Sequence, residues 1–180
     1  MHGIILSELK RFVEARHGAP TWPLLLERAG AANARYLANE TYPDRDVAAI
    51  VEAVSAMTGV EEQAVLEDFG EFIAPDLLDV YSALIRPEWR TLDVILNTER
   101  TVHTVVRMRS QGAAPPELKC VRTGPDEVIL TYDSPRRMCG VAKGIGRGLG
   151  KYFHEDIAIA ESACMHKGAP ACVISFRRLA

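Results

Sequence analysis

Apolar residues follow a helical spacing through the first hundred positions of the chain. The first predicted helix carries apolar residues every three or four positions, namely Ile5, Leu9, Phe12 and Val13. It ends within residues 17–20, where a glycine and a proline interrupt the pattern. The same spacing predicts further helices that begin near Trp22 and cover about residues 42–59, 61–72 and 77–84.

The longest predicted helix runs from about Thr91 to Ser110. It has a broad apolar face, which includes Leu92, Ile95, Leu96, Val102, Val105 and Val106, and His103 lies on the same side. The helix is expected to end at Gly112, because the two prolines that follow shortly after it cannot continue a helix.

After the prolines the pattern changes to short β-strands. Residues 118–122 and 128–132 flank Gly124-Pro125-Asp126, which predicts a β-hairpin. A helix over 137–153 follows, and residues 156–160 and 171–176 are expected to be strands. The predicted fold class is therefore α+β, in one domain over 1–180 with a mainly helical part, 1–112, and a sheet-containing part, 113–180.

Composition excludes several classes of protein. Of the 180 residues, 48% are hydrophobic and 25% charged, which is an ordinary globular balance, and the net charge of −3 does not favour binding to nucleic acid. The apolar runs are too short for membrane insertion, and the opening residues lack the pattern of a secretory signal. We therefore expect a cytoplasmic protein, in which the four cysteines are not a disulfide framework.

Residues 132–136, with the sequence YDSPR, place three hydrogen-bonding side chains on one side of an extended segment. Tyr132, Ser134 and Arg136 form a row of donors that suits a pair of carboxylates, such as the propionates of a porphyrin. A strand end whose arginine makes a surface ion pair is the alternative. For His103, taken alone, a hydrogen-bonded core histidine is the alternative to an iron ligand.

These residues resemble the heme nitric oxide/oxygen-binding (H-NOX) family, which includes stand-alone bacterial gas sensors and the heme domain of soluble guanylate cyclase. The resemblance rests on the Y-x-S-x-R row, the upstream histidine, the diproline between them and the opening Met-x-Gly-Ile-Ile, and it covers essentially the whole chain. It implies the H-NOX fold enclosing heme b, with His103 as the proximal iron ligand. It also implies that Tyr132, Ser134 and Arg136 hold the propionates and that Pro116 presses on the heme.

The resemblance also predicts which gas is bound. Family members that hold O2 carry a distal tyrosine, and Val141 aligns with that position. The other predicted distal neighbours carry no hydrogen-bond donor either: they are Ile5, Leu9, Ile73, Leu77 and Ile145. Bound O2 requires a donor whereas nitric oxide does not, so nitric oxide and CO are expected to bind at ferrous heme and O2 is not expected to bind stably.

By the same resemblance the chain is a sensor and not an enzyme. Nitric oxide is expected to release the bond between iron and His103, and the resulting conformational change is expected to regulate a separate protein. The sequence shows no kinase, cyclase or DNA-binding segment, so the output is expected to act in trans. The resemblance implies a histidine kinase or a cyclic-di-GMP enzyme as the partner.

Three of the cysteines, Cys139, Cys164 and Cys172, can supply the ligands of a zinc site. The tail resembles that of bacterial H-NOX proteins in which three cysteines and a histidine bind zinc, but the position of that histidine is occupied here by Glu161. The fourth ligand is thus Glu161 or His166. Alternatives are buried idle thiols, a disulfide formed on oxidation, or a zinc/thiol redox sensor without a role for heme. Cys120 is expected only to pack in the core.

Two further patterns suggest other functions. The glycine-rich run over 144–150 suggests a nucleotide-binding loop, but it follows helical sequence instead of a strand, so close helix packing is the better interpretation. A cysteine hydrolase using Cys164 and His166 is a third hypothesis, without a visible oxyanion hole or orienting acid.

Overall fold

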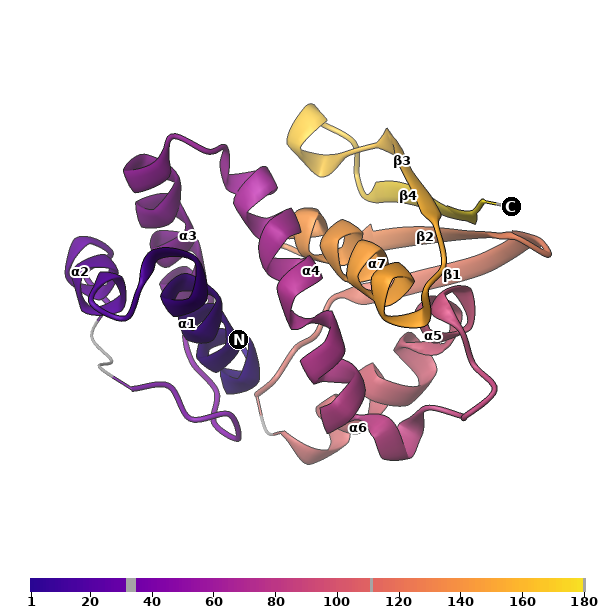
Figure 1. Cartoon of the computed structure of the whole chain (residues 1–180), viewed down its shortest axis with the longest axis horizontal. Coiled ribbons are helices and arrows are strands. Elements are labelled where there is room, and N and C mark those ends of the chain that lie inside the picture. Colours follow the sequence, from indigo (N-terminus) through magenta and orange to yellow (C-terminus); the bar gives the residue numbers. More distant parts are fainter. Residues whose placement is uncertain (32–34, 111, 180) are drawn as a thin grey trace.

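The computed structural model describes residues 1–31, 35–110 and 112–179. It contains a helical N-terminal portion and a four-stranded antiparallel sheet, with two long helices between them (Figure 1). This is the predicted α+β class. No helix in the described residues is both long and apolar enough to cross a membrane.

The N-terminal portion is built from α1 (Gly3–His17), α2 (Thr21–Arg28) and α3 (Asp44–Thr58). Helices α1 and α3 pack on α4 (Glu62–Val80), and α2 packs on α1 and α3. Together they form a first hydrophobic core around Leu6, Phe12, Ile50 and Phe69. Gly59 follows the last residue of α3, and its φ of 73° is the left-handed conformation that suits glycine after a helix.

Helix α4 corrects the prediction of two separate helices over 61–72 and 77–84. It runs without a break through Pro75, and only the short 3-10 helix η1 (Ser82–Leu84) follows it. Proline removes one backbone hydrogen bond, but the flanking residues Ile73, Ala74 and Leu78 are all buried. Packing on both sides of α4 therefore outweighs the local tendency of proline to break the helix.

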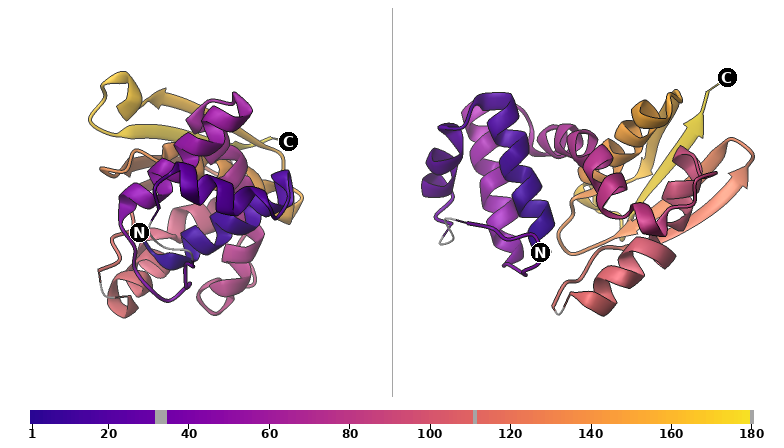
Figure 2. Two further views of the ribbon diagram at one scale, coloured as in Figure 1. Left: turned by 90° about the vertical axis from the view of Figure 1, so that its left-hand side faces the viewer. Right: turned by 60° about the horizontal axis from the view of Figure 1, so that its bottom comes forward.

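The predicted helix over 91–110 is present but is not uniform. It consists of α5 (Thr91–Asn97), the π-helical segment η2 (Glu99–His103) and α6 (Thr104–Arg109). Figure 2 shows α6 lying beneath the sheet portion, facing the end of the chain that begins α1.

The sheet has the strand order β1-β2-β4-β3, with all neighbours antiparallel. Its strands are β1 (Glu117–Gly124), β2 (Glu127–Asp133), β3 (Ile157–Ala163) and β4 (Cys172–Arg178), and the 3-10 helix η3 (Met165–Lys167) joins the last two. The predicted hairpin is confirmed, with Cys120 paired to Leu130. Alternate residues of β2, such as Val128 and Leu130, are buried in a second core beneath α5 and α7 (Cys139–Phe153).

Helices α4 and α7 pack so closely that their backbones touch. A Cβ atom added to Gly144 would lie 2.0 Å from the carbonyl oxygen of Glu67, and one added to Gly70 would lie 2.4 Å from that of Val141. Real Cβ atoms do not approach so closely, so glycine is required at these positions. The glycine-rich run is thus a helix-packing surface, as predicted, and not a phosphate loop.

This packing gives a first prediction. Gly144→Ala forces a methyl group against the backbone of α4, so we expect the free energy of unfolding to fall by about 1–3 kcal/mol, as in overpacked cores. Denaturant unfolding measures the change. Gly124→Ala is the matched control, because no atom lies within 4 Å of a Cβ built there, and it should stay within about 0.5 kcal/mol. Equal losses in the two variants would contradict the packing argument.

Candidate functional site

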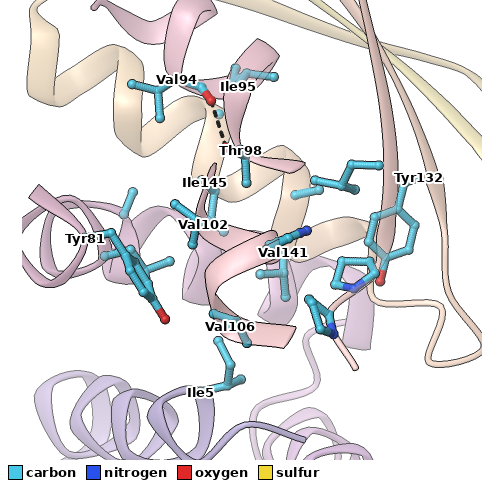
Figure 3. A pocket seen from close by; sticks show the side chains of 18 of the residues that line it. Ile5, Tyr81, Val94, Ile95, Thr98, Val102, Val106, Tyr132, Val141 and Ile145 are labelled. Atoms are coloured by element: carbon cyan, nitrogen blue, oxygen red, sulfur yellow. Dashed lines mark hydrogen bonds between the residues drawn. The ribbon is translucent and has the colours of Figure 1, made fainter. Parts of the chain in front are cut away.

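A cavity of about 230 Å³ lies between α4, the α5–α6 helix, α7 and the sheet. Its wall is mostly apolar, and Figure 3 shows the side chains of Ile5, Val102, Val106, Val141 and Ile145 arranged around it. Tyr132 stands at one side and Tyr81 at the other. Such a space suits a largely apolar ligand that a few polar groups orient.

His103 lies in the wall of this cavity, at the last residue of η2, and its side chain is 15% exposed. Its Nδ1 lies 3.0 Å from Glu99 Oε2. Because an ionised carboxylate only accepts hydrogen bonds, Nδ1 carries the proton and Nε2 keeps its lone pair. Burial lowers the pKa of His103 despite the opposing effect of Glu99, so the imidazole is neutral at pH 7.

Glu99 is itself fixed by several donors. Its Oε1 accepts a hydrogen bond from Arg107 at 2.6 Å, and its Oε2 accepts one from the backbone N–H of Leu118 at 3.2 Å. Burial alone would raise the pKa of Glu99, but the hydrogen bonds from Arg107 and His103 hold it below its ordinary value. The carboxylate therefore stays ionised and ties the histidine to strand β1.

The π-helical turn positions both residues. The N–H of His103 bonds to the carbonyl of Thr98, five residues earlier, at 3.1 Å. Threonine hydroxyls compete for backbone carbonyls on either side: that of Thr98 donates to Val94 (Figure 3), and that of Thr104 donates to Glu99. Apolar periodicity did not predict this irregularity, although the threonines spaced three apart at 98, 101 and 104 were its signal.

The predicted row of donors lies at the end of β2 and just after it, and two of its three side chains are buried. Tyr132 and Ser134 are 3% and 2% exposed, and the Ser134 hydroxyl oxygen accepts the N–H of Arg136 at 3.3 Å. Burial raises the pKa of the Tyr132 phenol, so it stays protonated and can donate. Tyr132 and Arg136 both line the cavity.

Arg136 also joins the sheet portion to the N-terminal portion. Its Nη1 lies 3.2 Å from both carboxylate oxygens of Asp44, the first residue of α3, and its Nη2 donates to the carbonyl of Ala114. The amino group of Met1 lies 2.8 Å from the same Asp44 carboxylate. Burial would raise the pKa of Asp44, but the hydrogen bond from Met1 and the charge of Arg136 keep it below its ordinary value.

Most of the predicted pocket residues line the cavity: His103, Pro116, Tyr132, Arg136, Ile5, Leu77, Val141 and Ile145. Leu9 and Ile73 do not. Both are fully buried in the N-terminal core, one helical turn away from Ile5 and Leu77 respectively. Ser134 is also outside the cavity lining and acts on the backbone beside it.

Tyr81 is a lining residue that the sequence analysis missed. It follows the last residue of α4, and burial raises the pKa of its phenol, so the hydroxyl stays protonated. Its position one turn beyond the predicted Leu77, within the predicted helix over 77–84, was the available signal. That the distal neighbours carry no hydrogen-bond donor stays a prediction, and Tyr81 is a phenol in the wall of the same cavity.

The three clustered cysteines meet at one point of the sheet portion. Cys139 begins α7, Cys164 follows β3 and Cys172 begins β4; together with Glu161 they place their ligand atoms within 4.8 Å of one another. The sulfur atoms of Cys164 and Cys172 are 3.9 Å apart. Four ligands about 2.3 Å from a central zinc lie about 3.8 Å apart, so the spacing matches a tetrahedral site.

Neighbouring groups support this cluster. The backbone N–H of Met165 donates to Cys172 Sγ at 3.2 Å, and Cys139 Sγ donates to Gln63 Oε1 on α4 at 3.6 Å. Burial raises the pKa of the Cys139 and Cys172 thiols, and neighbouring thiols raise that of Cys139 further. Several thiolates can therefore form together here only if a cation is present.

His166 does not join the cluster. It lies in η3, is exposed, and its Nε2 donates to the carbonyl of Arg137 at 2.7 Å. Cys164 is buried beside Cys172, so the structure does not bring together the cysteine–histidine pair of the hydrolase hypothesis. Cys120 packs against the second core as expected, and burial raises the pKa of its thiol to about 11.

The profile of the haem-NO-binding family matches residues 2–161. The chain belongs to this family. The H-NOX domain is a heme-based gas-sensing domain of the type found in soluble guanylate cyclases.

Known proteins agree with this assignment. The crystal structure of an H-NOX protein from S. oneidensis in the Fe(II)NO ligation state superposes with a TM-score of 0.93 at 25% identity, over 100% of both chains. The unliganded Fe(II) H-NOX protein from K. algicida shares the fold, with a TM-score of 0.88 at 18% identity over 100% of this chain and 97% of that one.

Soluble guanylate cyclase gcy-32 of Caenorhabditis elegans is 25% identical over 88% of this chain and 24% of its own length. The chain thus spans about a quarter of the length of such curated relatives.

The residues of this H-NOX domain fit a heme. A neutral imidazole with a free lone pair can bind iron, and the wall of the cavity is apolar. At one side, the phenol of Tyr132 and the guanidinium of Arg136 offer donors for carboxylates. These are the groups that a heme with two propionates requires.

The ion pair between Asp44 and Arg136 gives a prediction for pH dependence. A carboxyl whose folded pKa lies below its ordinary 3.8 contributes stability that is complete above that pH and is lost as the pH falls through the folded pKa. Asp44→Asn should therefore lower the Tm at pH 7, by an amount corresponding to less than about 1 kcal/mol. The difference from wild type should persist down to about pH 4 and shrink below it.

Thermal unfolding between pH 7 and pH 3 measures this difference. Asp133→Asn is the control, since Asp133 is exposed and makes no ion pair within the described residues. If the two variants showed the same pH profile, the role of the ion pair would be refuted.

Proposed function

We propose that this H-NOX domain holds ferrous heme b in the cavity, binds nitric oxide and CO but not O2 stably, and regulates a separate protein. The observation that carries the proposal is His103, a neutral histidine fixed by Glu99 in the wall of an apolar cavity. When bound, the ferrous heme supplies the iron that ligates the gas.

His103 is the proposed proximal ligand. Glu99 orients the ring and keeps Nε2 unprotonated, in the manner of carboxylates that support metal-bound histidines. Tyr132, Ser134 and Arg136 would hold the propionates, with Ser134 fixing the backbone before Arg136. Pro116 lies in the cavity wall, which supports its proposed role of pressing on the macrocycle.

Gas selectivity follows from the side chains that face the ligand. Val141, Ile145, Leu77 and Ile5 offer no hydrogen-bond donor. O2 bound to iron gains negative charge and needs a donor, whereas nitric oxide does not. Among the described residues, Tyr81 and Tyr132 are the two tyrosines that line the cavity. The proposed selectivity therefore requires that the hydroxyl of Tyr81 does not reach the bound gas.

Signalling is proposed to begin when nitric oxide causes His103 to leave the iron. His103 is covalently continuous with α6, which ends at Arg109, and the hydroxyl of the next residue, Ser110, lies 2.8 Å from His2 Nε2. Movement of α6 therefore reaches α1 directly, while Arg136 and Asp44 link the same two portions elsewhere. This arrangement supports a two-state change biased by the gas.

The proposed partner is a histidine kinase or a cyclic-di-GMP enzyme acting in trans, and the proposed location is the cytoplasm. The relatives from Caenorhabditis elegans are guanylate cyclases, of which this chain matches about a quarter. Cyclase activity is therefore not proposed for the chain itself.

Removal of the imidazole tests the iron ligand. His103→Gly should change the spectrum of the reduced heme protein, and added imidazole should restore it, because the free ring can occupy the space left by the side chain. His154→Gly is the control: His154 is exposed and has a φ of 57°, which glycine tolerates. An unchanged reduced spectrum in His103→Gly without imidazole would refute the assignment.

Gas selectivity is tested on reduced protein exposed first to air and then to nitric oxide. Wild type should give no stable oxygen complex and should give the absorption spectrum of a five-coordinate nitrosyl, which reports release of His103. Val141→Tyr adds a donor and should slow oxidation in air or permit O2 binding. Tyr81→Phe should match wild type. A stable oxygen complex in wild type, or a persistent six-coordinate nitrosyl, would contradict the proposal.

A zinc site is the second proposed function of the chain. The spacing of the ligand atoms of Cys139, Cys164, Cys172 and Glu161 favours it over idle thiols. Thiolate sulfur suits zinc, and the raised thiol pKa values mean that metal binding must release protons. Without metal, the adjacent Cys164 and Cys172 are the pair expected to form a disulfide on oxidation.

Elemental analysis tests this site. Protein purified without chelator should contain about one zinc per chain, as expected for a closed thiolate site. Cys172→Ser should lose the metal, whereas Cys120→Ser, which alters a thiol outside the cluster, should keep it. Metal-free wild-type protein with freely titratable thiols would exclude zinc and leave packing as the role of the cysteines.

A further inference from the structure

Glu161 is an unusual member of the cysteine cluster because its charge is largely buried. Its side chain is 15% exposed, and its Oε1 is buried without a hydrogen-bond partner. A buried carboxylate oxygen without a donor is costly unless a cation approaches it. A metal at the cluster is one such cation, and the structure contains a second.

The second cation is Lys143, which projects from α7 one turn after Cys139. Its Nζ lies 3.9 Å from Glu161 Oε1 and 2.7 Å from Glu67 Oε1 on α4, and its side chain is only 16% exposed. Lys143 thus stands between a metal-ligand candidate and α4, and it has charged partners on both sides.

The charge of the site explains why a lysine is needed. Three thiolates, one carboxylate and a Zn²⁺ carry a net charge of −2, whereas three thiolates, a neutral histidine and Zn²⁺ carry −1. In a partly buried site the additional negative charge is poorly solvated, so a cation nearby stabilises it.

We propose that Lys143 is a positioning residue of the zinc site, which holds Glu161 as the fourth ligand and neutralises its charge. The inference rests on the proposed zinc site. The ion pair between Lys143 and Glu67 anchors the ammonium group to α4, so the metal site is tied to the helix that also forms the cavity wall.

Zinc affinity of the purified full chain, measured by competition with a chromophoric chelator, tests the proposal. Lys143→Met keeps a long unbranched side chain but removes its charge, and we expect zinc to bind on the order of tenfold to a hundredfold more weakly. Lys143→Arg should retain most of the affinity. Arg147→Met is the matched control, since Arg147 also pairs with Glu67 but its ion pairs in the described residues go to Glu67 and Glu71.

The Glu161→His variant tests whether Lys143 acts on the charge of Glu161 or supports the zinc site in a general way. In Glu161→His the fourth ligand is neutral, so Lys143→Met should then have little effect on zinc affinity. Because the effect of Lys143→Met is compared between the two backgrounds, a loss of stability common to all Lys143→Met proteins cancels, and thermal unfolding identifies any variant that does not fold.

The outcomes are distinct. If wild type binds zinc but Lys143→Met binds it equally well, or if Arg147→Met weakens it as much, the role of Lys143 is overturned while the zinc site stands. An equal loss in the Glu161→His background also overturns it. If wild type binds no zinc at all, the zinc site itself fails, and this inference fails with it.

Discussion

The close contact between α4 and α7 is the constraint on which the rest of the structure depends. Glycines at positions 70, 144 and 148 allow the two backbones to touch, because a Cβ at any of them would overlap the opposite helix. With α7 held there, its first turns face in two directions. Val141 and Ile145 reach the cavity, and Cys139 reaches the turn between β3 and β4. Both candidate sites are thus consequences of one helix–helix contact (Figures 1 and 2).

Periodicity predicted the elements that local sequence determines, such as the β1–β2 hairpin and the placement of His103 on a helix. It could not predict which turn of a helix meets the cavity. Ile5 and Leu9 share one face of α1, a turn of about 5.4 Å apart, and only the first lines the cavity. The same holds for Ile73 and Leu77. Periodicity shows which residues share one face of a helix. It does not show which turn of that helix lies next to the cavity, because this depends on how the helices cross.

The sequence alone could not decide between two candidates for the fourth ligand of the cysteine cluster, for a similar reason. Glu161 and His166 are both close to Cys164 in sequence, and only the backbone conformation separates them. Residue 161 lies on β3 with its side chain toward the cluster, while residues 165–167 turn as a 3-10 helix that carries His166 to the Arg137 carbonyl. The π-helical turn before His103 is another such case, since it depends on threonine hydroxyls competing for carbonyls along the chain.

The shared helix also limits how the two sites can influence each other. Contiguity alone does not establish coupling, which requires an element with two arrangements that both ligands bias. The first turn of α7 is the natural candidate, because Cys139 and Val141 are two residues apart on it and Gln63 of α4 holds its N-terminus through Gly140. If metal at the cysteines changes gas affinity by some factor, linkage requires that gas change metal affinity by the same factor. Coupling through the population of folded protein obeys the same reciprocity, so only affinities measured on fully folded protein report coupling through this helix.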